Sequence, residues 1–388
     1  MKVLFITYHY LSGNGGGQFA SRAFINAFSE ISDELMLIYP DNGEDIKDNL
    51  DNRIIFHPIR SKKSVFIKAI NLLFGKLHKI DFNILKNEIL DKHIFNLIVF
   101  DTCMMGDLTQ KIKHLGYKTL TIHHNVQTDY YKDNKKSFLF NALGCFGYWV
   151  KKNEYYALRF SDVNLTLTES DAVKLSTIYK LSPSIIIINI GCFEFSTNKN
   201  QNLNENTTIG QLCFIITGNL SAIQTENSLI PFIKTYYPII QNDFPEHLLI
   251  IAGKDPSNNL SKLLSNYPQI QLIPNPEKII DIIVRGTIYI CPISLGSGIK
   301  LRVMDGLKSG LPVLTHITSE RGYEELKKLG YIFSYYDTVS FRIALSKSIQ
   351  TATELKKSEL ITSYINQFSF DAGVKRLKII LKEYGLNF

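Results

Sequence analysis

The sequence is poor in cysteine. Five cysteines occur among 388 residues, with no CxxC pair and no histidine spacing typical of zinc ligands. We therefore interpret them as buried thiols in a reducing cytoplasm, and we predict no metal site. The five are Cys103, Cys145, Cys192, Cys213 and Cys291.

Long apolar runs are also missing. No apolar stretch reaches the length that spans a bilayer, and the longest candidates contain Lys or Asn. The N-terminal apolar run leads into a polar, Gly-rich loop without a small-residue cleavage site, so we interpret it as a strand and not as a signal peptide. These features predict a cytoplasmic protein without a transmembrane anchor.

The excess of positive charge is modest. A formal net charge of +7 does not predict a dedicated nucleic-acid binder. With 45% hydrophobic and 20% charged residues, the composition excludes wholesale disorder. The length exceeds the roughly 250 to 300 residues at which one core stops growing, so we expect two domains.

The positive charge is concentrated in two segments that also contain apolar and aromatic residues. Residues 60–79 contain six cations and no acidic residue, and residues 132–152 combine lysines with phenylalanines and Trp149. As helices, these segments would suit an anionic membrane surface and a lipid-linked acceptor. An ordinary core-facing helix with a solvated basic face explains residues 60–79 equally well.

Strand-like and helical segments alternate along the chain. This alternation predicts an α/β protein with parallel sheets covered by helices on both faces. A polar, Asn-rich stretch at 194–211 interrupts the pattern and is interpreted as a linker. We predict two Rossmann-like doubly wound domains facing a cleft, over 1–193 and 212–370, with a last helix in 371–388 that packs back on the first domain.

The segment 291–316 carries the most specific signal. A predicted strand is followed by a Gly-x-Gly turn at Gly296 and Gly298, then by Lys300 and Arg302, and a helix is predicted over 301–309. Glycines, cations and a helix N-terminus together favour a bound phosphate, and Asp305 on the same helix can accept hydrogen bonds from a ribose. The alternative is a surface turn with a helix-start aspartate.

This segment, GSGIKLRVMDGLKSGLPV, resembles the donor-binding signature of the group 1 glycosyltransferases, the retaining family four. TIHHNVQTDYY resembles the family's strand-end histidine segment, and FIITGNLSAIQTEN resembles the opening of its second domain. The resemblance extends along nearly the whole chain. It implies the GT-B fold, no metal or other cofactor, and transfer of a sugar from a UDP- or GDP-sugar with retention.

The resemblance also implies roles for individual residues. His124 would contact the donor sugar. A lone strand-end histidine more often satisfies a backbone carbonyl, but the place of His124 in a matching motif favours the functional role. Lys300 and Arg302 would stabilise the leaving diphosphate. The donor-binding residues implied are Gly16, Gly17, Gly218, Asn219, Asn275, Pro276, Ser297, Gly298, Ile299 and Asp305.

The sequence departs from the family at the donor site. Ser297 and Asp305 stand where two glutamates are usual. Asn219 follows Gly218 where many members have an arginine, and Thr225 or Glu226 falls near the place of a lysine. Our hypothesis is that Lys300 and Arg302 supply the charge that this missing pair would have provided.

The sequence thus predicts a glycosyltransferase that acts on a glycan or lipid-linked acceptor, in bacterial surface polysaccharide assembly at the inner face of the membrane. A nucleotide-sugar epimerase is a second possibility, but no pair of carboxylates for its chemistry stands out. A third is a non-catalytic sugar-nucleotide-binding partner of another glycosyltransferase, which the missing glutamate and cations favour.

Overall fold

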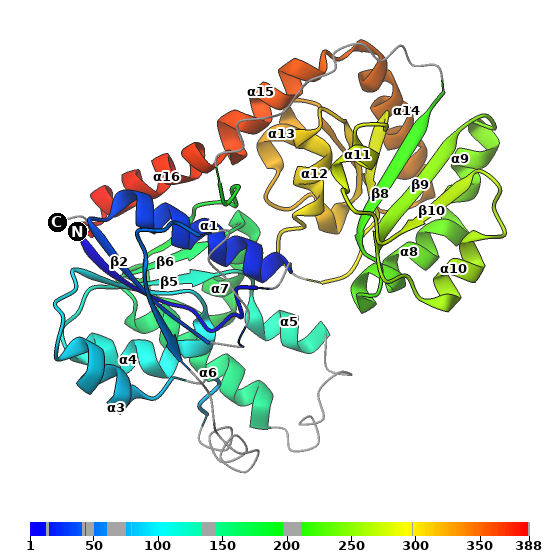
Figure 1. Cartoon of the computed structure of the whole chain (residues 1–388). Coiled ribbons are helices and arrows are strands. Elements are labelled where there is room, and N and C mark those ends of the chain that lie inside the picture. The colour runs from blue at the N-terminus through cyan, green and yellow to red at the C-terminus, as the bar shows by residue number, and fades with distance from the viewer. Residues whose placement is uncertain are drawn as a thin grey trace. The chain divides into compact units, whose positions relative to one another are not determined.

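The protein consists of two compact α/β units, seen in a computed structural model that describes residues 1–12, 15–40, 43, 50–59, 75–78, 80–133, 145–196, 211–296 and 298–386. The first unit comprises Met1–Asn198 and Phe368–Phe388, and the second comprises Lys199–Gln367. Each is built on one parallel sheet with helices between its strands (Figure 1). The prediction of two Rossmann-like domains is confirmed.

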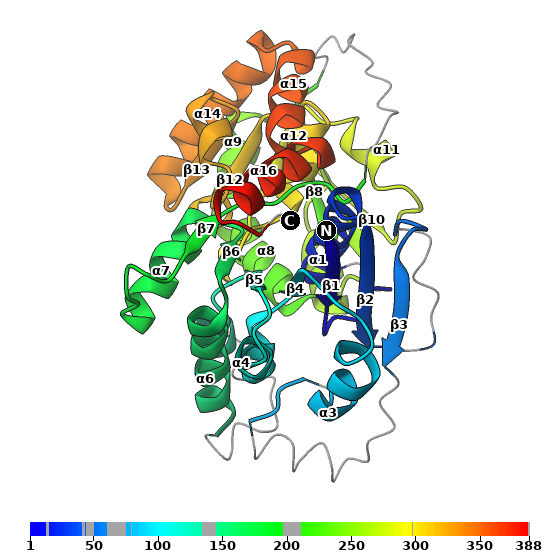
Figure 2. The same cartoon turned by 90° about the vertical axis from the view of Figure 1, so that its left-hand side faces the viewer.

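The first sheet has seven strands in the order β3-β2-β1-β4-β5-β6-β7, and every pairing is parallel (Figure 2). Its strands are β1 (Lys2–Ile6), β2 (Glu34–Pro40), β3 (Ile55–Ile59), β4 (Leu97–Phe100), β5 (Thr119–His123), β6 (Val163–Thr166) and β7 (Ile187–Asn189). The helices of this unit are α1 (Gly16–Ile31), α3 (Phe82–Leu85), α4 (Gly106–His114), α5 (Gln127–Asp133), α6 (Cys145–Phe160), α7 (Glu169–Tyr179) and α16 (Phe370–Glu383).

The central strands of this sheet are buried on both faces. Along β1, Leu4 and Ile6 join a core cluster that includes residues of α3 and α4. The alternate residue Phe5 lies against Phe28 of α1, with ring centroids 5.8 Å apart. Successive side chains of a strand point to opposite faces, so an unbroken apolar run is what a sheet covered on both sides requires.

The second sheet has six strands in the order β10-β9-β8-β11-β12-β13, again all parallel. Its strands are β8 (Cys213–Asn219), β9 (Leu248–Lys254), β10 (Ile270–Pro274), β11 (Ile288–Cys291), β12 (Val313–His316) and β13 (Ile332–Tyr335). Its helices are α8 (Ile223–Thr235), α9 (Tyr237–Asp243), α10 (Asn258–Leu264), α11 (Ile280–Ile283), α12 (Arg302–Lys308), α13 (Glu324–Lys328), α14 (Thr338–Glu354) and α15 (Lys357–Phe368).

The last helix, α16, lies along α1 of the first unit (Figure 1). Its Arg376 donates hydrogen bonds to the carbonyl oxygens of Ile190 and Cys192, at 2.8 and 3.2 Å. Gly373 packs so closely against the ring of Phe193 that a Cβ at this position would lie only 2.1 Å from the ring. The helix is therefore held by a close glycine contact and by a guanidinium that satisfies two carbonyls.

Several predictions concern segments outside the described residues. The described residues do not include 60–74, 79 and 134–144 of the two basic segments. They also do not include 197–210 of the expected linker. Ser297 is also outside them. Within the described ranges, no helix has the length and apolar character needed to cross a membrane. The side chains of four of the five cysteines are described, and all four are buried free thiols.

We expect Gly373→Ala to destabilise the protein. Alanine has the higher helix propensity, by about 1 kcal/mol, so an increase in stability would be expected at a free helix surface. Here the added methyl group meets Phe193, and overpacking of this kind costs about 1 to 3 kcal/mol. Urea unfolding should give a lower midpoint than the wild type, whereas Lys375→Ala on the exposed side of α16 should not. An unchanged or higher midpoint for Gly373→Ala would contradict the contact.

Candidate functional site

The strand order of each sheet reverses at one place, between β1 and β4 in the first unit and between β8 and β11 in the second. All strands are parallel, so their carboxyl ends lie at the same edge of the sheet. In open α/β sheets, ligands bind outside the carboxyl ends at this reversal. The residues that follow β1, β4, β8 and β11 are therefore the first candidates.

In the second unit, the reversal brings Arg302 of α12 onto the end of β8. A Cβ at Gly218 would lie 2.4 Å from both Nε and Cζ of Arg302, so only glycine leaves room for the guanidinium. Gly218 also has a φ of +141°, in the region that favours glycine. Arg302 Nη2 donates to Thr225 Oγ1 at 2.7 Å and approaches the carbonyl oxygen of Asn219 at 3.4 Å.

The other terminal nitrogen of Arg302 is unsatisfied. Nη1 is buried and has no hydrogen-bond partner among the described residues. A buried donor on a cation that lacks an acceptor costs about 1 to 3 kcal/mol or more. An anion bound beside Gly218 would remove this cost, so the geometry itself favours an anionic ligand.

The Gly-x-Gly turn lies against the start of α8. Gly296 and Gly298 have φ values of +88° and +70°, which explains why glycine occupies both positions. A Cβ at Gly296 would lie 2.9 Å from the side-chain nitrogen of Gln224, and the backbone N–H of Ser294 donates to Ser228 Oγ at 3.1 Å. The turn is thus fixed on the same helix that carries Thr225.

Lys300 and the helix after it are less favourable for anion binding than the sequence predicted. The Nζ of Lys300 lies 3.4 Å from the carbonyl oxygen of Gly298, and its own carbonyl accepts from Tyr323 at 3.0 Å. The helix predicted over 301–309 is present as α12, which spans Arg302–Lys308. Gly310, at φ +72°, turns the chain out of the helix. Few peptide dipoles are aligned in so short a helix, which leaves Arg302 as the main positive group.

The remaining donor residues predicted in this unit lie at the same edge or on α12. Asp305 pairs with Lys308 on α12, with 3.0 Å between Oδ1 and Nζ. Asn275, at φ +47°, accepts from the backbone N–H of Asp255 at 2.9 Å, so its side chain holds the turn after β9. Pro276 and Ile299 are half-buried and Gly298 is buried.

In the first unit, the reversal brings together four polar residues. Thr7 follows β1, Asp101 follows β4 and His124 follows β5. Thr7 Oγ1 donates to Asp101 Oδ2 at 2.6 Å, and His124 Nε2 lies 2.9 Å from both Oδ1 and the carbonyl oxygen of Asp101. The ring of His9 stands edge-on to that of His124, with centroids 5.6 Å apart.

The hydrogen bonds among Thr7, Asp101 and His124 determine which nitrogen of His124 carries the proton. Both partners of His124 Nε2 are acceptors, so Nε2 carries the proton. Its Nδ1 is buried, without a partner among the described residues, and is left as an acceptor. Burial acts to raise the pKa of Asp101, but the hydrogen-bonded and electrostatic interaction with His124 is the main effect that outweighs it, and the pKa is held below its usual value. Burial lowers the pKa of His9 to about 4, so His9 is neutral at pH 7.

Sequence reasoning missed Thr7, His9 and Asp101. A signal for them existed, because Thr7 and Asp101 directly follow the two strands that border the reversal. Gly16 and Gly17 were predicted, and they begin α1. A Cβ at Gly17 would lie 3.3 Å from Cε1 of His9, so this glycine lets the imidazole lie close to the helix start.

A buried carboxylate supports the segment after His124. Glu154 of α6 accepts hydrogen bonds from the backbone N–H groups of Gln127 and Thr128, from Thr128 Oγ1 and from Tyr179. Burial raises the pKa of Glu154, and these hydrogen bonds act against the rise. The carboxylate thereby satisfies the first N–H groups of α5 and fixes the chain just beyond His124.

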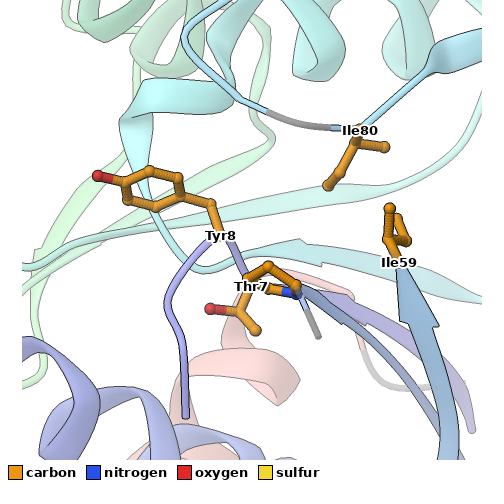
Figure 3. Close-up of a pocket in the computed structure, with 5 residues that line it drawn as sticks. Thr7, Tyr8, Ile59 and Ile80 are labelled. Carbon is orange, nitrogen blue, oxygen red and sulfur yellow. The ribbon is translucent and has the colours of Figure 1, made fainter. Parts of the chain in front are cut away.

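A small pocket lies at the carboxyl edge of the same sheet. It is lined by Thr7, Tyr8, Pro40, Ile59 and Ile80, which end or follow β1, β2 and β3 or precede α3 (Figure 3). Its walls are mostly apolar. Burial raises the pKa of the Tyr8 hydroxyl, which therefore stays protonated at neutral pH. The pocket thus offers an apolar surface beside the polar cluster.

Solved structures similar to this protein cover almost its whole length. HepE of Anabaena, in complex with UDP and glucose, matches with a TM-score of 0.66 at 12% identity, covering 99% of this chain and 100% of HepE. A glycosyltransferase of Rickettsia africae matches at 0.64 and 14%, covering 100% and 99%. The lipopolysaccharide outer core galactosyltransferase WaaB matches at 0.63 and 13%, covering 99% of each chain.

These matches show that the chain has the GT-B fold. No protein-family model matches the sequence. No curated protein is significantly similar to it either.

Removing the charge of Glu154 should destabilise the first unit. In Glu154→Gln, an amide N–H₂ replaces one acceptor oxygen and faces a donor, so at least one charge-assisted hydrogen bond is lost, at a cost of about 3 kcal/mol. Urea unfolding monitored by circular dichroism should show this loss. The exposed Glu88→Gln should unfold like the wild type. Equal stability of Glu154→Gln and the wild type would show that the carboxylate does not hold α5.

Proposed function

We propose that this protein is a retaining glycosyltransferase that moves a sugar from a UDP- or GDP-sugar to a glycan or lipid-linked acceptor. The observation that carries the proposal is the buried, unpaired Nη1 of Arg302 beside Gly218, at the strand reversal of the second sheet. The GT-B fold and the likeness to HepE, solved with UDP and glucose, support it.

The diphosphate of the donor binds at Arg302. Nη1 donates to a phosphate oxygen, while Nη2 remains on Thr225 and keeps the guanidinium in place. Negative charge grows on the diphosphate as the glycosidic bond breaks, and a preorganised cation in a partly buried site stabilises it. Lys300 adds a second positive charge from the Gly-x-Gly turn.

The position of Arg302 supports the hypothesis that it replaces the missing family cations. Those cations would follow Gly218 and stand near Thr225. Arg302 contacts both places, since its Nη2 reaches Thr225 Oγ1 and the carbonyl of Asn219. One guanidinium from α12 therefore occupies the region that two side chains on the β8–α8 segment would otherwise fill.

The other donor contacts follow from the same placement. Asp305 accepts from the ribose hydroxyls, and the backbone of Asn275 and Pro276 holds the base. Gly218, Asn219, Gly298 and Ile299 line the phosphates. Ser297, Gly16 and Gly17 stay donor residues that only the family resemblance implies. The transfer requires no metal, because the protein's own cations take up the charge.

His124 contacts a hydroxyl of the donor sugar. Its buried Nδ1 has no hydrogen-bond partner among the described residues and can accept from this hydroxyl. Asp101 fixes the ring by accepting a hydrogen bond from Nε2. Asp101 is thus a positioning residue. The acceptor attacks from the side of the leaving diphosphate, a phosphate oxygen takes its proton, and the anomeric configuration is retained.

The acceptor is presented at the inner face of the cell membrane, in bacterial surface polysaccharide biosynthesis. Residues 60–79 and 132–152 make peripheral contact with the lipid. The described part of the second segment supports this, because Tyr148 is 61% exposed and Lys152 lies over the rings of Trp149 and Tyr156.

A nucleotide-binding panel tests the donor site. Calorimetry without added metal should show binding of UDP or GDP, and Arg302→Ala should weaken it by more than about tenfold, because a charge-assisted hydrogen bond is lost. Arg342→Ala, which removes an exposed guanidinium of the same unit, is the control. Lys300→Ala should bind nucleotide more weakly and turn over more slowly.

Three outcomes separate the alternatives. Tight nucleotide binding without sugar transfer to any acceptor would favour the non-catalytic partner. Full affinity in Arg302→Ala would refute the assignment of the diphosphate, and unchanged turnover in Lys300→Ala would refute the role of that lysine. Proton NMR of the glycoside product distinguishes retention from inversion.

The sugar contact is tested separately. We expect His124→Gln to lower kcat by about a hundredfold, the usual cost of losing a preorganised polar contact in a transition state. Nucleotide affinity should not change, since UDP or GDP binds the second unit. His93→Gln, at an exposed position, should behave as the wild type. Wild-type kcat in His124→Gln would exclude His124 from the site.

A further inference from the structure

The cluster at the strand reversal of the first unit has the composition of a metal site. His9, Asp101 and His124 each offer one ligand atom, and these atoms all lie within 4.8 Å of one another. Two imidazoles and one carboxylate form a common ligand set for divalent transition metals. We propose that these three residues bind a zinc-class divalent transition-metal ion.

The spacing is close to what one ion requires. Two ligand atoms on a tetrahedral zinc ion lie roughly 3.4 Å apart, given bond lengths near 2.1 Å. The atoms of this cluster lie within 4.8 Å of one another, so the more distant ones must approach by up to about 1.4 Å. His124 Nε2 and Asp101 Oδ1, at 2.9 Å, are closer than this and must separate slightly to admit the ion.

The surroundings orient the ligands. Thr7 Oγ1 donates to Asp101 Oδ2 at 2.6 Å, which leaves Oδ1 directed toward His124. Hydrogen bonds of this kind fix ligand carboxylates in metal sites. Gly17 keeps the space beside the His9 ring open, because a Cβ there would lie 3.3 Å from Cε1.

Access and protonation are compatible with an ion. His9 and the side chain of His124 are partly exposed, at 12% for His124, so an ion can reach the cluster from solvent. When a metal takes the place of the proton on His124 Nε2, that proton moves to Nδ1, and the imidazole stays neutral. The three protein ligands leave a further coordination position for water or a hydroxyl group.

A second cluster of possible metal ligands is the alternative site for the ion. Cys103, His123 and Glu154 also place ligand atoms within 4.8 Å, but all three are buried. Both oxygens of Glu154 already accept hydrogen bonds from the start of α5. We assign the ion to His9, Asp101 and His124, whose ligand atoms are reached without breaking the start of a helix.

The proposal does not depend on glycosyl transfer. It is tested by metal binding to the tag-free full chain, first stripped with a chelator. If the protein is a glycosyltransferase, an ion on His124 would exclude the sugar, so added Zn²⁺ would inhibit an enzyme that needs no metal. Inhibition of transfer by Zn²⁺ would follow from metal binding, but only the measurement of metal binding tests the proposal.

The experiment is a titration with Co²⁺, followed by its visible ligand-field absorption, and with Zn²⁺, followed by calorimetry. We expect one ion per chain. His9→Gln should bind it more than about tenfold more weakly, as loss of a ligand predicts, and Asp101→Asn should show the same loss. His93→Gln should bind like the wild type. His9 is partly exposed, so its variant tests the site even if Asp101→Asn fails to fold.

Three results would overturn the proposal. The first is full affinity in His9→Gln. The second is a sulfur-to-cobalt charge-transfer band that Cys103→Ser abolishes, because it would place the ion at the buried cluster. Absence of any stoichiometric binding of Co²⁺ or Zn²⁺ would also reject the site, without bearing on whether UDP or GDP binds at Arg302.

Discussion

The proposed donor site depends on one charged group, the guanidinium of Arg302, which is held in place by the protein but not fully satisfied by it. Thr225 holds Nη2, Gly218 makes room for the group, and Nη1 has no acceptor among the described residues. A protein can keep such a group when a ligand completes it. The glycine, the hydroxyl and the arginine therefore form one unit, and none of them explains the site alone.

The same topological constraint produces a polar cluster in each unit, with opposite charge. Parallel strands leave an opening where their order reverses, and the residues after the bordering strands meet there. In the first unit the opening contains the buried carboxylate of Asp101, paired with His124. In the second it contains the cation of Arg302.

The sequence predicted the two sheets, because buried strands in a parallel sheet are continuous apolar runs and the helices between them keep their own period. It also singled out Arg302 as a candidate, since glycines and cations lay together within residues 296–302. It did not predict Asp101 or Thr7 as partners, which are 94 residues apart in the chain, or the contact of Arg302 with Thr225, which spans 77 residues. Such pairs depend on the register of the sheets. The bounds predicted for α12 agree with the structure to within one residue at each end.

A structure of the protein with UDP or GDP bound, refined well enough to place the phosphates, would show whether Arg302 holds the diphosphate. We expect a phosphate oxygen within hydrogen-bond distance of Arg302 Nη1, about 2.7 to 2.9 Å, with Nη2 still on Thr225. A nucleotide bound away from Gly218, or an Nη1 that pairs with a protein oxygen while the nucleotide is bound, would contradict this expectation.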